Sequence, residues 1–135
     1  MKLILQLASL SCFVATLGLA GDVRGWLVDS RCFASIDGNR NAPEDQSDEN
    51  LSIRYCSPRT KTRSFSIVEQ ETGSSVKFDS VGNEKAISLG LNASNKFAYL
   101  GKVTGVKSGK TFNVQAISII KRVERNGKGA PGVGL

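Results

Sequence analysis

The chain contains no histidine in any of its 135 residues. Histidine is the usual general base at neutral pH and the commonest metal ligand in proteins. It is also the base of serine–histidine and cysteine–histidine nucleophile arrangements. Since none of these sites can be built here, the sequence predicts a protein that is not an enzyme and that carries no metal and no cofactor.

A long apolar run occurs at the N-terminus. Lys2 precedes an apolar segment over residues 3–20 that ends in small residues, with Gly18 and Ala20 at positions −3 and −1 of a cleavage site. This pattern is typical of a cleavable secretory signal peptide, and a retained anchor or lipidation at Cys12 is the weaker alternative. We therefore predict that residues 1–20 are a signal peptide, that the protein is secreted or periplasmic, and that no membrane anchor remains after cleavage.

Cysteine is scarce, with three residues in the chain, of which Cys32 and Cys56 follow the predicted signal peptide. In an oxidising compartment, two cysteines in a small domain most simply form a disulfide. A bridge that closes a loop of about 25 residues is expected to raise the free energy of unfolding by roughly 3 to 4 kcal/mol, because it lowers the entropy of the unfolded chain. A redox-active or metal-binding thiol pair is the alternative, but the spacing is far from Cys-x-x-Cys.

Removing residues 1–20 leaves a chain long enough for one compact domain and too short for two. We expect this domain to span residues 21–125 and a flexible tail, half glycine and proline, to span residues 126–135. The formal net charge of +6 is moderate and compatible with anionic partners.

Residue alternation predicts five strands and one helix. The strands are expected at residues 22–29, 64–70, 76–79, 96–106 and 111–120, and the helix at residues 83–91, capped by Ser80 or Asn83. Residues 30–63 show no periodicity and are predicted to form a long loop with one helical turn near residues 44–51. In the last strand the apolar phase changes between Ala116 and Ile117, which indicates a β-bulge or a barrel corner.

Strand, long loop, hairpin, short helix and hairpin is the element order of the OB-fold. The fold class predicted is therefore all-β, a small five-stranded OB-like barrel with one short helix and a long disulfide-tied loop after strand one. An open five-stranded sheet with one helix packed on a face is the alternative, since element order does not determine strand pairing.

The two ends of the predicted domain resemble a group of small secreted bacterial proteins and, more widely, periplasmic bacterial OB-fold proteins. The resemblance is carried by a glycine–hydrophobic–x–Asp–x–x–Cys first strand and a Val-x-Gly hairpin, here Gly25-Trp26-Leu27-Val28-Asp29-Ser30-Arg31-Cys32 and Leu100-Gly101-Lys102-Val103-Thr104-Gly105. It implies a fold and a location outside the cytoplasm, and it implies no chemistry.

A basic segment with two aromatic residues is the candidate binding site. Its members fall close together with no acidic residue among them: Arg54, Tyr55, Arg59, Lys61, Arg63 and Phe65. On the ligand face of an OB-fold such residues bind a phosphate backbone, or stack a base or sugar. The alternative is a solvated basic surface that balances the acidic residues just upstream.

Two acidic features have simpler structural interpretations. At the end of the first strand, Asp29 or Ser30 is predicted to cap the turn that follows, and Asp29 is not expected to act as a catalytic acid or metal ligand. An acidic cluster lacks the spacing of a calcium-binding loop and is predicted to be a solvated segment; it consists of Glu44, Asp45, Asp48 and Glu49.

The function predicted from these features is a secreted, non-enzymatic binding or interaction module whose partner is an anionic ligand, a glycan or a protein. A thiol-redox protein or an enzyme is one alternative, and a structural envelope or matrix component is the other.

The predicted export and disulfide are testable by intact mass. Protein purified from its native host is expected to begin at Gly21, to be lighter than its reduced form by two hydrogens, and to resist alkylation until it is reduced. Mass spectrometry with and without reductant measures all three. A free, readily alkylated cysteine pair, or a retained or lipidated N-terminus, would contradict the assignment.

Overall fold

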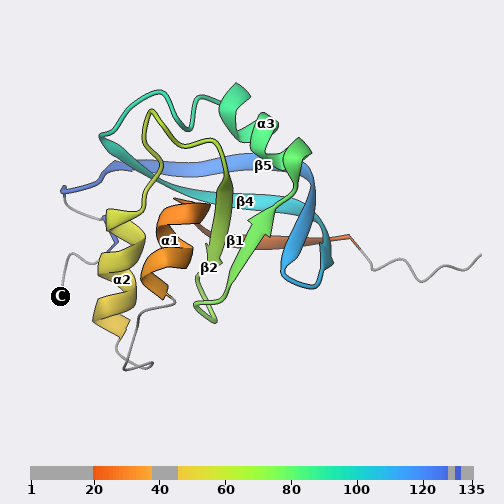
Figure 1. Ribbon diagram of the computed structural model, residues 1–135, viewed down its shortest axis with the longest axis horizontal. Helices are drawn as coiled ribbons and strands as arrows, with labels where there is room; N and C mark the ends of the chain where they lie inside the picture. Colours follow the sequence, from red (N-terminus) through yellow and green to blue (C-terminus); the bar gives the residue numbers. More distant parts are fainter. Residues whose placement is uncertain (1–19, 38–45, 128–129, 132–135) are drawn as a thin grey trace, which may run out of the picture.

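The computed structural model describes residues 20–37, 46–127 and 130–131, so residues 1–19 of the predicted signal peptide lie outside the described residues. Five strands and three helices follow one another along the chain (Figure 1). Their order is β1 Gly21–Asp29, α1 Ser30–Asp37, α2 Gln46–Tyr55, β2 Phe65–Glu69, β3 Ser75–Phe78, α3 Ser80–Ser88, β4 Phe97–Ser108 and β5 Thr111–Glu124.

The five strands close into a ring in the order β1-β2-β3-β5-β4. Every neighbouring pair is antiparallel except β3 and β5, which run parallel over a short ladder. β1 pairs with β2 through residues 25–29 and with β4 through residues 21–27. The prediction of a strand-rich, five-stranded domain is confirmed, and β5 extends beyond its predicted end to Glu124.

The inside of the ring is the main hydrophobic core. Side chains from all five strands meet there, and Phe65, Ile67 and Val103 are completely buried. Helix α3 contributes Ala86 to this core, and Leu91, which follows the helix, is buried there too. Full burial of large side chains contributes about 1.5 to 3 kcal/mol each, so this interior accounts for much of the stability.

Helix α3 begins differently from the prediction. Its N-cap is Asp79, whose Oδ1 accepts hydrogen bonds from Gly82 N at 2.9 Å and from Val114 N at 3.2 Å. The predicted caps Ser80 and Asn83 were wrong: Ser80 is the first residue of the helix, and Asn83 Oδ1 accepts from Phe65 N. Asp79 therefore caps α3 and also attaches it to β5.

The predicted bulge in the last strand is confirmed. The pairing of β4 with β5 shifts register between Leu100 and Gly101 and again between Thr104 and Gly105. Each shift inserts one extra β5 residue, which moves the following side chains to the other face. Phe112 and Val114, on one side of the shift opposite Thr104 and Gly105, are buried. On the other side of this shift Ala116 is exposed and Ile117 packs against the core.

The long loop predicted after strand one is wrong for most of its described residues, because they include α1 and α2; the helical turn expected near residues 44–51 overlaps α2. α1 is amphipathic but only eight residues long, α2 has a weak apolar face, and short helices owe most of their stability to tertiary packing. Phe33 and Ile53 supply that packing by burying themselves against the outer face of the ring. The fold therefore has three helices, where one short helix was expected.

A second hydrophobic cluster joins these two helices to the ring. It contains Val28 of β1, Val68 of β2, Phe33, Ile53 and Cys56. Trp26 is half-buried against the same cluster, so β1 is apolar on both faces. Figure 1 shows α1 and α2 next to each other, away from α3.

The segment after β5 is described in part. Gly127 N donates to Glu124 O, and Ala130 and Pro131 are buried. The flexibility predicted for residues 126–135 stays a prediction.

Within the described ranges, no helix has both the length and the apolar character required to cross a membrane.

Removing the Asp79 carboxylate tests its double role. Asp79→Ala is expected to lower the free energy of unfolding by about 2 kcal/mol, since it removes a helix cap and leaves Val114 N without a partner. Urea denaturation measures the loss. Asp22→Ala, which removes a carboxylate bonded only at the exposed surface, is the control and is expected to cost less than about 1 kcal/mol; equal losses would contradict the assignment.

Candidate functional site

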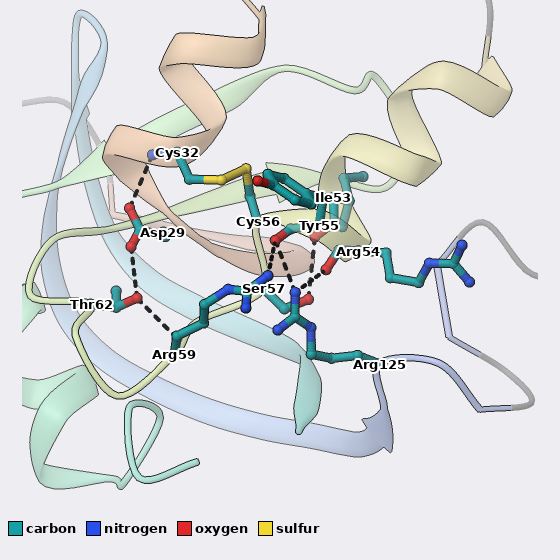
Figure 2. Close-up of a disulfide and its surroundings, with 10 residues drawn as sticks. All are labelled: Asp29, Cys32, Ile53, Arg54, Tyr55, Cys56, Ser57, Arg59, Thr62 and Arg125. Atoms are coloured by element: carbon teal, nitrogen blue, oxygen red, sulfur yellow. Dashed lines mark hydrogen bonds between the residues drawn. A yellow bond between two sulfur atoms is a disulfide. The ribbon is translucent and has the colours of Figure 1, made fainter. Parts of the chain in front are cut away.

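The predicted disulfide is present and joins the two helices. Cys32 lies in α1 and Cys56 directly follows α2, with an S–S distance of 1.99 Å and a Cα–Cα distance of 5.5 Å. Cys56 is completely buried in the second hydrophobic cluster, and Cys32 is partly buried there. The bridge therefore holds the C-terminal end of α2 in position (Figure 2).

Asp29 caps α1, as predicted. Its Oδ1 accepts a hydrogen bond from Cys32 N at 3.0 Å, and its Oδ2 accepts from Thr62 Oγ1 at 2.7 Å. Thr62 Oγ1 in turn accepts from Arg59 N at 2.9 Å, and Figure 2 shows this chain of bonds running from α1 to the segment after α2. Both carboxylate oxygens are therefore engaged in holding the backbone.

Arg125, which follows β5, is the residue that organises the site. Its side chain is buried, and its Nη2 donates to Arg54 O at 3.1 Å and Tyr55 O at 2.9 Å (Figure 2). Its Nη1 donates to Asn95 O at 3.0 Å. The first two acceptors belong to the last turn of α2, where backbone carbonyls lack helical partners and carry partial negative charge. Arg125 thus joins α2 to the ring.

Burial lowers the pKa of the Arg125 guanidinium, and the nearby cations Arg59 and Arg54 lower this pKa further. Carbonyl dipoles stabilise the buried charge, but they do not neutralise it. The guanidinium groups of Arg59 and Arg54 therefore repel that of Arg125, and an anion bound beside them would reduce this repulsion.

A surface groove of about 860 Å³ lies beside this cluster. Its lining combines four cationic side chains, one carboxylate, two amides, a tyrosine and a leucine: Arg54, Arg59, Lys96, Arg125, Glu124, Asn95, Asn126, Tyr55 and Leu51. They come from α2 and the segment after it, from the segment before β4, and from the end of β5 and the residues that follow it. We call this feature the basic groove. Its charge suits an anionic ligand.

The structure brings together three of the six residues predicted as a site. Arg54, Tyr55 and Arg59 line the basic groove. Lys61 and Arg63 are exposed on the segment after α2 but do not line the groove. Phe65 is fully buried in the core of the ring, so it cannot contact a ligand at the surface.

Arg59 and Tyr55 are in direct contact. Arg59 Nη2 donates to Tyr55 O at 3.1 Å, and the guanidinium carbon lies 5.6 Å from the centroid of the Tyr55 ring, within the range of a cation–π contact. Arg59 and Arg125 therefore share one carbonyl oxygen, which fixes both guanidinium groups beside the groove.

The sequence analysis missed six of the nine lining residues, including Lys96, Glu124 and Arg125. These three lie far along the chain from the residues of α2 that they meet: the bond from Arg125 to Tyr55, for example, joins residues 70 positions apart. The pairing of β4 with β5, continued by the bond from Arg125 N to Lys96 O, brings them there. No local pattern could have identified them, because the signal is a tertiary one.

The structure describes no side chain of the acidic cluster. Glu44 and Asp45 lie outside the described residues, and of Asp48 and Glu49 only the helical backbone in α2 is described. In the part of the chain that the structure covers, no group of three or more histidine, cysteine, aspartate or glutamate residues could hold a metal ion.

Comparisons with protein-family models, with curated proteins and with solved structures find no match to this chain. Its function is therefore argued from the basic groove alone.

The anchoring role of Arg125 is testable with a conservative change. Arg125→Lys is expected to lower the free energy of unfolding by about 2 kcal/mol, because an ammonium cannot reproduce the planar donors that reach three carbonyls. Arg54→Lys is the matched control and is expected to change stability by less than about 0.5 kcal/mol, since that side chain has no hydrogen bond within the described part of the chain. Chemical denaturation compares the two, and similar values would contradict the anchoring role.

Proposed function

We propose that this protein is a secreted or periplasmic, non-enzymatic binding module that holds an anionic ligand in the basic groove. The observation that supports this proposal is the charge of the groove, where four cationic side chains accompany a single carboxylate. Concave surfaces of one charge sign raise the local concentration of oppositely charged ligands.

The proposal includes an OB-like barrel as the scaffold. It is supported by the order of the strands in the ring, by the parallel pairing of β3 with β5, and by the position of α3 between β3 and β4. In this proposal the ligand lies beside α2 and the ends of β4 and β5. It does not lie on the β2–β3 face that OB-folds commonly use, because no residue of those strands lines the groove.

Export is supported by the N-terminal segment and by the disulfide, which fits an oxidising compartment. The burial of Cys56 favours a structural role for the bridge over the thiol-redox alternative, since thiol–disulfide exchange requires access to a sulfur atom. The bridge then serves the binding site by holding α2.

The proposal is tested by titrating the protein with inorganic sulfate, an oligouronate and a single-stranded oligonucleotide. At least one anion is expected to bind, with an affinity that falls as salt is raised to about 0.15 M. The double variant Arg54→Ala/Lys96→Ala is expected to raise the dissociation constant at least about tenfold, because it removes two charge-assisted contacts. Titration calorimetry measures both effects.

The control is Arg24→Ala/Lys77→Ala, which makes the same change in charge at exposed positions outside the groove. If no anion binds, or if both double variants weaken binding equally, the basic groove is not the site and the proposed function is wrong.

A further inference from the structure

The four cations that line the basic groove differ in whether their side chains already donate hydrogen bonds to backbone carbonyls. Arg125 uses both terminal nitrogens on backbone carbonyls, and Arg59 uses one of its own in the same way. Arg54 and Lys96 have no side-chain hydrogen bond or ion pair among the residues that the structure describes. Arg54 and Lys96 therefore offer a ligand all of their donors, whereas Arg125 and Arg59 have donors that are already engaged.

Glu124 is the unusual member of the lining. Its carboxylate is exposed and has no hydrogen-bond or ion-pair partner within the described ranges, although four cations line the same groove. A carboxylate in this position repels a ligand whose charged groups have no hydroxyl donors beside them, such as a DNA backbone. The same carboxylate is a strong acceptor for hydroxyl groups. The groove is therefore suited to a ligand that has hydroxyl donors as well as negative charge.

The remaining groups of the lining suit a sugar ring. Tyr55 is 61% exposed, and Leu51 beside it in the lining is 46% exposed. A tyrosine ring offers an apolar face with a polar edge. Two amides, Asn95 and Asn126, add donors and acceptors that match a pattern of hydroxyl groups. A single exposed ring can support one sugar, whereas single-stranded nucleic acids are bound by several stacked aromatics.

We propose that the ligand of the basic groove is an acidic, hydroxyl-rich sugar: a uronate unit of an acidic oligosaccharide or polysaccharide. This inference rests on the proposed function and specifies its ligand. The sugar carboxylate pairs with Arg54 and Lys96, its hydroxyl groups donate to Glu124, and its ring packs on Tyr55. The amides of Asn95 and Asn126 complete the recognition of the hydroxyl groups.

Glu124 makes this proposal distinguishable from binding of a densely charged polyanion, because its removal changes affinity in opposite directions. Glu124→Ala is expected to weaken trigalacturonate binding about tenfold, through loss of the hydroxyl acceptor. The same variant is expected to strengthen binding of a single-stranded oligonucleotide, through loss of repulsion. Titration calorimetry at low ionic strength, on the full mature protein, measures both ligands.

Two variants of Tyr55 provide a second test, of whether the sugar ring packs on the tyrosine ring. Tyr55→Phe keeps the ring and is expected to bind trigalacturonate within about twofold of the unmodified protein, whereas Tyr55→Ala is expected to bind it at least about tenfold more weakly. Both variants keep the backbone carbonyl that Arg59 and Arg125 share. Thermal unfolding of each variant establishes that the fold is retained before binding is compared.

The outcomes separate this inference from the proposed function. If the oligonucleotide binds more tightly than trigalacturonate, or if Glu124→Ala strengthens trigalacturonate binding, the uronate assignment is wrong while an anionic ligand is retained. If neutral galactose oligomers bind as tightly as trigalacturonate, or if Arg54→Ala/Lys96→Ala leaves binding unchanged, the proposed function fails as well.

Discussion

The guanidinium of Arg125 is the contact on which the arrangement of the groove depends. It is buried, and it donates to three backbone carbonyls, two of which end α2. A cation at the C-terminal end of a helix is favourable because the unpaired carbonyls there carry partial negative charge. This contact ties the end of α2 directly to the end of β5, whereas hydrogen bonds such as the one from Thr60 N to Asn95 Oδ1 join the segment after α2 to the segment before β4.

This contact matters because α2 does not belong to the ring. The five strands complete their own core, and α1 and α2 are added to its outer face through Phe33, Ile53 and the apolar outer residues of β1 and β2. The disulfide links α1 to the end of α2, and Asp29 accepts hydrogen bonds from Cys32 N in α1 and from Thr62 Oγ1 in the segment after α2. The groove lies where this added layer meets the ends of β4 and β5, so its shape depends on how the two parts are joined.

The proposed chemistry follows from the same architecture. Two of the four cations, Arg59 and Arg125, already donate to the end of α2, which leaves Arg54 and Lys96 to face a ligand. They do so beside Glu124, whose carboxylate has no hydrogen-bond or ion-pair partner among the described residues. A surface built only to attract polyanions has no use for a carboxylate in its lining. The mixture of signs, with one exposed tyrosine, favours an acidic, hydroxyl-rich sugar as the ligand.

Local patterns were enough to predict the strands, the bulge in β5, the cap at Asp29 and the disulfide, because each depends on residues close in sequence or on the scarcity of cysteine. They failed for α1 and α2, short helices that depend on packing against the ring and on the disulfide. The site divides in the same way: Arg54, Tyr55 and Arg59 are neighbours in the chain, whereas Lys96, Glu124 and Arg125 reach them only through strand pairing. The sequence by itself determined a strand-rich, bridged domain with a basic segment. Only the tertiary structure decided that this segment faces a groove containing a carboxylate, since that depends on contacts between residues some 70 positions apart.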